Sequence, residues 1–119
     1  MSERIFKHSD FLEAADTEPL RSEITASKDA SISSWIVKPG QSISLHMHPH
    51  GQDTWVVQSG IGQYTLDAQG TVKTIIEGDV VVAKAGEIHG VVNTGSQALT
   101  FISVLSPPDA GLEWINTKD

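Results

Sequence analysis

The pattern of hydrophobic and polar positions changes near residue 31. From there onward, short runs of valine, isoleucine, threonine and aromatic residues alternate with turns that contain glycine. Such runs are typical of β-strands, because β-branched and aromatic side chains fit a pleated, half-buried surface. The pattern predicts strands over residues 31–37, 42–48, 54–58, 62–67, 72–76, 79–83, 89–93 and 98–105. Strand starts roughly ten residues apart, with no helical pattern between them, indicate an all-β sandwich or closed barrel with antiparallel pairing.

Residues 1–30 lack this pattern. Asp10 and Glu13 lie three residues apart, and two alanines follow, which predicts a helical turn or two that Pro19 ends. We therefore expect a short N-terminal arm over residues 1–30 and a single β-domain over residues 31–119.

The composition fits one folded domain. With 119 residues, 39% of them hydrophobic and 19% charged, the chain has room for one core and is too apolar to be disordered throughout. Its apolar runs are far shorter than the ~20 residues that cross a bilayer, and its first residues lack the basic start and apolar stretch of a secretory signal. We therefore expect a cytoplasmic protein. The absence of cysteine excludes disulfides, iron–sulfur clusters, thiolate zinc sites and a cysteine nucleophile.

Charge and the apolar chain ends indicate which partners to expect. The formal net charge of -7 has the wrong sign for holding a phosphate backbone, so nucleic acid is excluded as an expected partner, and no membrane partner is expected.

A small barrel has two sheets to cover, and several apolar residues near the ends need burial, which predicts a homodimer. These residues are Ile5, Phe6, Phe11, Leu12, Trp114 and Ile115.

Three histidines and one aspartate have a spacing that suggests a metal site. His46 and His48 are two apart in a predicted strand, so both side chains leave the same face with α-carbons about 6.5–7 Å apart, a span that two imidazoles can close around one ion. Asp53 follows the next turn and His89 opens a later strand, so they could complete a set of three nitrogens and one oxygen across an antiparallel sheet. Taken alone, a histidine in a strand is more often a surface or hydrogen-bonded core residue than a metal ligand.

The glycines around these residues extend the pattern. The first segment has Gly40, His46, His48, Asp53 and Gly60, with five, one, four and six residues between them, and it resembles the first conserved motif of the cupin superfamily. The second has Gly78, Lys84, Gly86, His89 and Asn93, with five, one, two and three residues between them, and it resembles the second cupin motif. Aspartate stands where that family usually has glutamate, and Lys84 where proline is usual. We expect the glycines to be turn residues, and Asn93 either orients a ligand or ties down the next loop.

The resemblance implies a double-stranded jelly-roll β-barrel with a divalent metal in its mouth, bound by His46, His48, Asp53 and His89. An aspartate is one methylene shorter than a glutamate, so its oxygens fall about 1.5 Å short unless the strand approaches more closely or a water bridges the gap. Gln52 is an alternative oxygen ligand, but in an extended strand it faces away from Asp53.

A site of this kind suits one divalent ion of Fe, Mn, Ni, Zn, Co or Cu, and ligand type alone does not choose among them. The resemblance implies a metalloenzyme that acts on a small oxygen-rich substrate, sugar-like or keto-acid-like, as an isomerase, an epimerase or a dioxygenase-like enzyme. The alternative is a small-molecule-binding or sensor protein without catalysis. Catalysis would need a polar or titratable group beyond the ligands, for which His50, Tyr64 and Gln58 are the candidates.

Overall fold

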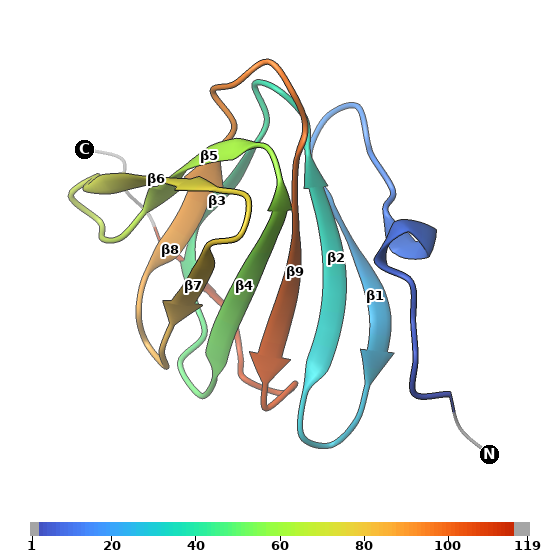
Figure 1. Ribbon diagram of the computed structural model, residues 1–119. Coiled ribbons are helices and arrows are strands. Elements are labelled where there is room, and N and C mark those ends of the chain that lie inside the picture. The colour runs from blue at the N-terminus through green and yellow to red at the C-terminus, as the bar shows by residue number, and fades with distance from the viewer. Residues whose placement is uncertain (1–2, 116–119) are drawn as a thin grey trace.

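Two five-stranded antiparallel sheets face each other in the computed structural model, which describes residues 3–115 (Figure 1). The first sheet has, in order, β1 (Leu20–Ala26), β2 (Ser31–Val37), β9 (Leu99–Ser106), β4 (Gln52–Ser59) and β7 (Val80–Ala83). The second has β10 (Glu113–Trp114), β3 (Ser42–Met47), β8 (His89–Val92), β5 (Ile61–Thr65) and β6 (Val72–Ile76). The predicted all-β jelly-roll barrel is therefore confirmed.

All eight predicted strands are present, with ends that differ by no more than two residues. The sequence did not predict β1 and β10, because neither carries a run of apolar positions. β1 is an edge strand with no fully buried side chain, and β10 has only two residues. A four-residue 3₁₀ helix, η1 (His8–Phe11), lies beside β1 (Figure 1). It begins earlier and is shorter than predicted: Asp10 lies inside it, and residues 12–15 are not helical. The division of the chain at residue 31 stays a prediction, and β1 lies on its N-terminal side as a member of the first sheet.

Inward-facing residues change from apolar to polar along three paired strands of the first sheet. The apolar members are Val37 and Trp35 on β2, Val57 and Trp55 on β4, and Leu99 and Phe101 on β9. The polar members are Ser31 and Ser33 on β2, Asp53 on β4, and Ser103 on β9. Pairing of Val37 with Leu99 and of Ser33 with Ser103 keeps the two groups in register. The apolar group, with Trp55 and Phe101 stacked 4.0 Å apart, forms the core, and the polar group gathers at the other end of the sheet.

A β-bulge in β3 sets the position of the histidines. His46 pairs with His89 and Ile43 with Val91, so two residues of β3 lie opposite the single residue Gly90 of β8. A Cβ atom on Gly90 would lie 2.8 Å from the carbonyl oxygen of Ile43, so the bulge requires glycine there. Because of the extra residue, Ile43 and His46 both face the space between the sheets, which strict alternation would not allow.

The loops of the two motifs are held by specific hydrogen bonds. Asn93 is fully buried; its amide nitrogen donates to the carbonyls of Val37 and Gln97, both at 2.8 Å, and its oxygen accepts from the Gly95 amide at 2.9 Å. Of the two roles left open for Asn93, the structure therefore supports tying down the loop. The glycines that frame the motifs have φ between 82° and 91°, as expected of turn residues.

Lys84, the residue where the cupin motif usually has proline, begins the turn before β8. Its backbone amide donates to the Glu87 carboxylate at 2.8 Å, a bond that proline could not make. The amide of Gly86, in the same turn, donates to the carbonyl of His48 at 2.9 Å. Lysine at this position therefore lacks the rigidity of proline but gains a hydrogen bond to a side chain. The bond from Gly86 holds the turn against the segment that carries His48.

Apolar residues near both ends of the described chain differ in exposure. Ile5 is 87% exposed and Trp114 65% exposed, whereas Phe6 and Phe11 pack edge to face with ring centroids 6.3 Å apart. We expect a homodimer that covers the exposed residues, and light scattering should give twice the 12.8 kDa mass of one chain. Replacing Ile5 with serine should shift the equilibrium toward the monomer. A mass near 12.8 kDa at micromolar concentration would contradict the expected dimer.

Candidate metal centre

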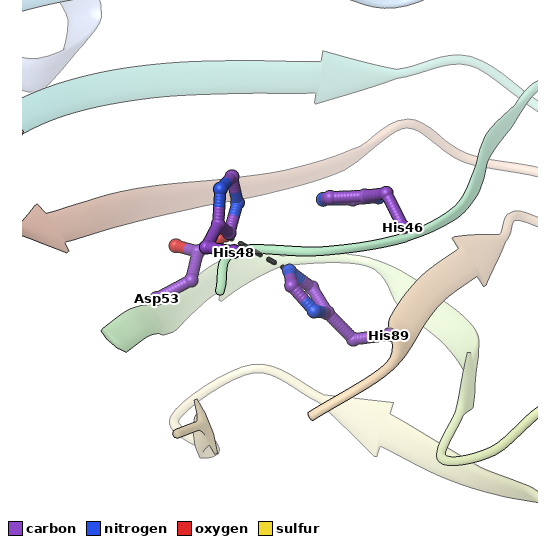
Figure 2. Close-up of side chains that lie close together, drawn as sticks. All are labelled: His46, His48, Asp53 and His89. Atoms are coloured by element: carbon purple, nitrogen blue, oxygen red, sulfur yellow. Dashed lines mark hydrogen bonds and ion pairs between the residues drawn. The ribbon is translucent and has the colours of Figure 1, made fainter. Parts of the chain in front are cut away.

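Four side chains from three strands converge between the sheets (Figure 2). His46 lies on β3 and His48 directly after it, Asp53 lies on β4 of the facing sheet, and His89 opens β8. One potential ligand atom from each of the four lies within 4.8 Å of all the others. The rings of His46 and His89, which are paired across neighbouring strands, have centroids only 4.2 Å apart. The spacing in the sequence and the antiparallel fold thus bring together the four predicted residues.

The backbone holds all three imidazole rings in one tautomer. In each ring Nδ1 lies within hydrogen-bond distance of a backbone carbonyl oxygen, which can only accept, so Nδ1 carries the proton. The acceptors are Ser44 for His46 at 2.7 Å, Gly111 for His48 at 2.7 Å, and Glu87 for His89 at 3.2 Å. When the rings are neutral, each Nε2 is therefore left with a lone pair. A hydrogen bond from Nδ1 to a backbone carbonyl is typical of histidines that bind a metal through Nε2.

Asp53 lies close to two of the three Nε2 atoms despite its short side chain. Its Oδ2 atom lies 3.0 Å from Nε2 of His89 and 3.6 Å from Nε2 of His48, while Oδ1 accepts a hydrogen bond of 2.8 Å from the Ser103 hydroxyl. A carboxylate oxygen and an unprotonated Nε2 repel each other at such distances unless a proton or a cation lies between them. Ligands about 2.1 Å from one ion lie about 3.0 to 4.2 Å apart, so the four residues fit a divalent ion after a small contraction.

The protonation of the cluster favours a cation. Burial, and then the neighbouring His89, lower the pKa of His46 to about 4, so this ring is neutral at neutral pH. Burial acts to raise the pKa of Asp53, but its contacts with the His48 and His89 rings and the hydrogen bond from the Ser103 hydroxyl outweigh it and hold this pKa well below its usual range. The Asp53 carboxylate, 3.6 Å from Nε2 of His48, in turn raises the pKa of His48. The site thus holds a fixed negative charge beside nitrogen donors, one of which binds a proton when no metal is present.

A cavity of about 240 Å³ lies between the sheets, and His46, His48 and Asp53 form part of its wall. Trp35, Trp55 and Trp114 also line it, and these are all the tryptophans in the chain. Its remaining residues are Ile43, Leu105 and Leu112, which are apolar, and Arg21, Ser31, Ser33 and Ser103, which are polar. His89 is 1% exposed and does not line the cavity, so a molecule in the cavity would meet the cluster at His46, His48 and Asp53.

The structure places Gln52 outside the cluster and His50 and Tyr64 away from the cavity. Gln52 is exposed and its amide donates to the Thr54 hydroxyl at 3.3 Å, so strand alternation directs Asp53 inward and Gln52 outward, as expected. His50 is exposed in the turn before β4. Tyr64 is buried and packs against Trp55, and burial raises its pKa above the ordinary value. The catalytic roles predicted for His50 and Tyr64 stay predictions, and no cavity contact supports them.

Sequence reasoning missed three residues of the cavity wall. Arg21 lies on the unpredicted strand β1, Trp114 lies on the two-residue strand β10 opposite His46, and Ser103 holds the carboxylate of Asp53. Alternation along β9 could have pointed to Ser103, since it is an isolated polar residue among inward-facing apolar ones. Nothing comparable marks Arg21, because its neighbours are polar.

Comparison with known proteins identifies the family. The family described as "Cupin domain" matches residues 33–105, more than half of the chain and both motifs. The chain belongs to the cupin family. A solved structure from Klebsiella pneumoniae, an uncharacterized conserved protein with a double-stranded β-helix domain, is 37% identical to this cupin and has a TM-score of 0.92. The match covers 97% of this chain and 99% of that one.

Two further proteins show where the fold recurs. The polyketide cyclase RemF from Streptomyces resistomycificus has a TM-score of 0.81 over 100% of this cupin and 89% of RemF, but at 18% identity it supports the fold alone. The mannose-1-phosphate guanylyltransferase of Escherichia coli is 36% identical over 70 residues, which are 59% of this cupin. The chain spans only 14% of that enzyme's length, so the resemblance concerns one part of a much larger protein.

No helix within residues 3–115 is long and apolar enough to cross a membrane. The cytoplasmic location stays a prediction.

Proposed function

We propose that this cupin is a metalloenzyme that binds one divalent transition metal through Nε2 of His46, His48 and His89 and a carboxylate oxygen of Asp53. The observation that carries the proposal is the tautomer: three Nδ1 atoms are committed to backbone carbonyls, so three lone pairs and one carboxylate meet at one point. Iron, manganese, nickel, zinc, cobalt and copper all accept this ligand set.

The substrate we propose is a small oxygen-rich molecule, sugar-like or keto-acid-like, that chelates the ion from the cavity. Four protein ligands would leave one or two positions of an octahedral ion for a substrate, and His46, His48 and Asp53 line the cavity that the substrate would enter. A bound ion there would act as a Lewis acid that polarises a substrate oxygen, or as a site for oxygen chemistry if it is iron. Isomerisation, epimerisation or a dioxygenase-like reaction fits this arrangement. The match to part of a mannose-1-phosphate guanylyltransferase adds support for an oxygen-rich ligand.

One observation favours the alternative, a cupin that binds a small molecule without converting it. Outside the cluster, the polar side chains on the cavity wall, among the described residues, belong to one arginine and three serines, none of which exchanges a proton near neutral pH. An isomerase or epimerase needs a general base, which here would have to be a cluster residue or a group brought in by the substrate.

Turnover with defined metals distinguishes the two functions. Metal-free protein reloaded with Fe(II), Mn(II), Ni(II) or Zn(II) is incubated with a panel of aldoses, ketoses and 2-oxo acids, and products are followed by NMR and oxygen uptake with an electrode. The enzyme proposal expects a product that forms with one metal and is absent in His46→Ala. Saturable binding of a panel member to the loaded protein, with no product under any metal, would contradict catalysis and support the binding protein.

Metal affinity should fall as the pH is lowered below the raised pKa of His48. A proton on Nε2 of His48 must leave before the metal can bind, so the affinity should drop about tenfold for each pH unit below that pKa. Burial keeps His46 neutral until the pH approaches 4, where its own pKa lies, and Asp53 stays ionised throughout. Zinc titrations by calorimetry at pH 8, 7, 6 and 5 measure this slope, with His50→Ala as the matched control. An affinity that is unchanged from pH 8 to pH 5 would be inconsistent with histidine ligation.

A further inference from the structure

The cavity contains a fixed positive charge away from the metal cluster. Arg21 on β1 lines the cavity, and among the described residues on its wall it is the one side chain that is positively charged at every physiological pH. We infer that Arg21 binds a carboxylate of the substrate, so that the ligand has an oxygen-chelating end at the metal and an anionic end at Arg21. This inference rests on the proposed function only for the chelating end.

Arg21 is held where a ligand can reach it. Its Nη2 atom donates to the hydroxyl of Ser31 at 2.6 Å, and Ser31, on β2, is buried and part of the cavity wall. The side chain of Arg21 nevertheless stays 44% exposed. A guanidinium has five N–H donors in a planar fork that matches a carboxylate. One bond to Ser31 fixes the side chain and leaves donors available for a ligand.

The carboxylate of Glu23 is the present ion-pair partner of Arg21, at 3.5 Å from Nη2. Both side chains are about half exposed, and an ion pair of this kind contributes little to stability, so a ligand carboxylate can compete with it. Because Glu23 also stands beside the guanidinium and the protein carries a net charge of -7, the site suits one negative charge better than the two of a phosphate monoester.

The serine hydroxyls of the cavity wall all come from the first sheet. Ser31, Ser33 and Ser103 lie there beside the apolar Trp35, Trp55 and Leu105, and Ser103 bonds directly to Asp53. Ser33 is 1% exposed, and its hydroxyl has no hydrogen-bond partner among the residues that the structure describes, which leaves a polar group for a ligand atom. On the other side lie Ile43, Leu112 and Trp114, which are apolar or aromatic. A ligand with a hydrophobic body and oxygen atoms along one edge complements both walls.

Tryptophan fluorescence tests this inference directly, because all three tryptophans line the cavity. The probes are 3-phenylpropionate, its uncharged amide and 2-phenylethyl phosphate, titrated into the protein as purified and after metal removal. We expect wild type to bind the carboxylate about tenfold more tightly than the amide, as a charge-assisted hydrogen bond implies. Arg21→Gln should abolish the preference and Arg21→Lys should retain part of it. Glu23→Gln should tighten binding of the carboxylate, because it removes the competing charge.

Arg4→Gln, which removes an exposed arginine outside the cavity, is the matched control and should behave as wild type. If Arg21→Gln still prefers the carboxylate over the amide as wild type does, the inference is wrong. If that preference also disappears in His48→Ala, the carboxylate binds at the cluster and not at Arg21. Tighter binding of 2-phenylethyl phosphate through Arg21 would overturn the assignment to a carboxylate. Metal content, measured on the same samples, tests the proposed function separately: a wild type without metal that still prefers the carboxylate would refute only the metal site.

Discussion

Replacing His46 or His89 with alanine is expected to lower the affinity for a divalent metal by more than 100-fold. Even the loss of a residue that only supports a ligand costs about 10- to 100-fold, and here a nitrogen donor itself is removed. No other described side chain is placed to replace it, since Gln52 points outward and His50 lies outside the cluster. Elemental analysis of protein purified without added metal, followed by zinc titration of the metal-free form, measures the effect.

His50→Ala is the matched control for these two substitutions. It removes an imidazole two residues from His48 that is exposed and absent from the cluster, so metal content should stay at the wild-type level. Thermal unfolding of the metal-free variants separates a lost ligand from a lost fold. Wild-type metal content in both His46→Ala and His89→Ala, or loss of metal in His50→Ala, would show that the ion binds elsewhere.

The sequence predicted that the four cluster residues converge because a strand has a period of two and the turns are short. Those two regularities place His46 beside His48 and return Asp53 to them from the next strand, and neither depends on details of packing. The strand pattern predicted an antiparallel sandwich or barrel, and the resemblance to the cupin motifs implied the jelly roll. The support of the ligands could not be predicted, because the carbonyls of Ser44, Glu87 and Gly111 are backbone groups that any residue carries.

The cavity was less predictable than the cluster. Its wall depends on the bulge opposite Gly90, which turns Ile43 inward, and on the edge strands β1 and β10, which carry Arg21 and Trp114. A bulge changes which residues face inward without changing composition, and edge strands have weak hydrophobic patterns. The specificity that we propose for the cavity thus depends on the elements with the weakest sequence signals, whereas the candidate metal site depends on the strongest ones.

Asp53→Glu is expected to weaken metal binding about tenfold and to destabilise the protein by about 1–3 kcal/mol, the usual cost of extra methylenes in a packed interior. Asp53 is buried on β4, which is paired on both sides, with β9 and with β7, so the backbone has little freedom to withdraw. Its Oδ1 is already bound by Ser103 and its Oδ2 already lies 3.0 Å from His89. One more methylene would push the carboxylate about 1.5 Å further into the nitrogens. Zinc calorimetry and urea unfolding measure the two effects.

Asp29→Glu, which adds the same methylene in the exposed turn between β1 and β2, is the control and should change neither quantity. Asp53→Asn separates length from charge: it keeps the side chain's size and removes its negative charge, so it should weaken metal binding with a smaller loss of packing. Tighter zinc binding by Asp53→Glu would contradict this prediction. It would mean that Asp53 reaches the ion only through a water molecule, and that the longer glutamate binds the ion directly. Since the aspartate already lies within hydrogen-bond distance of a ligand nitrogen, we expect the opposite result.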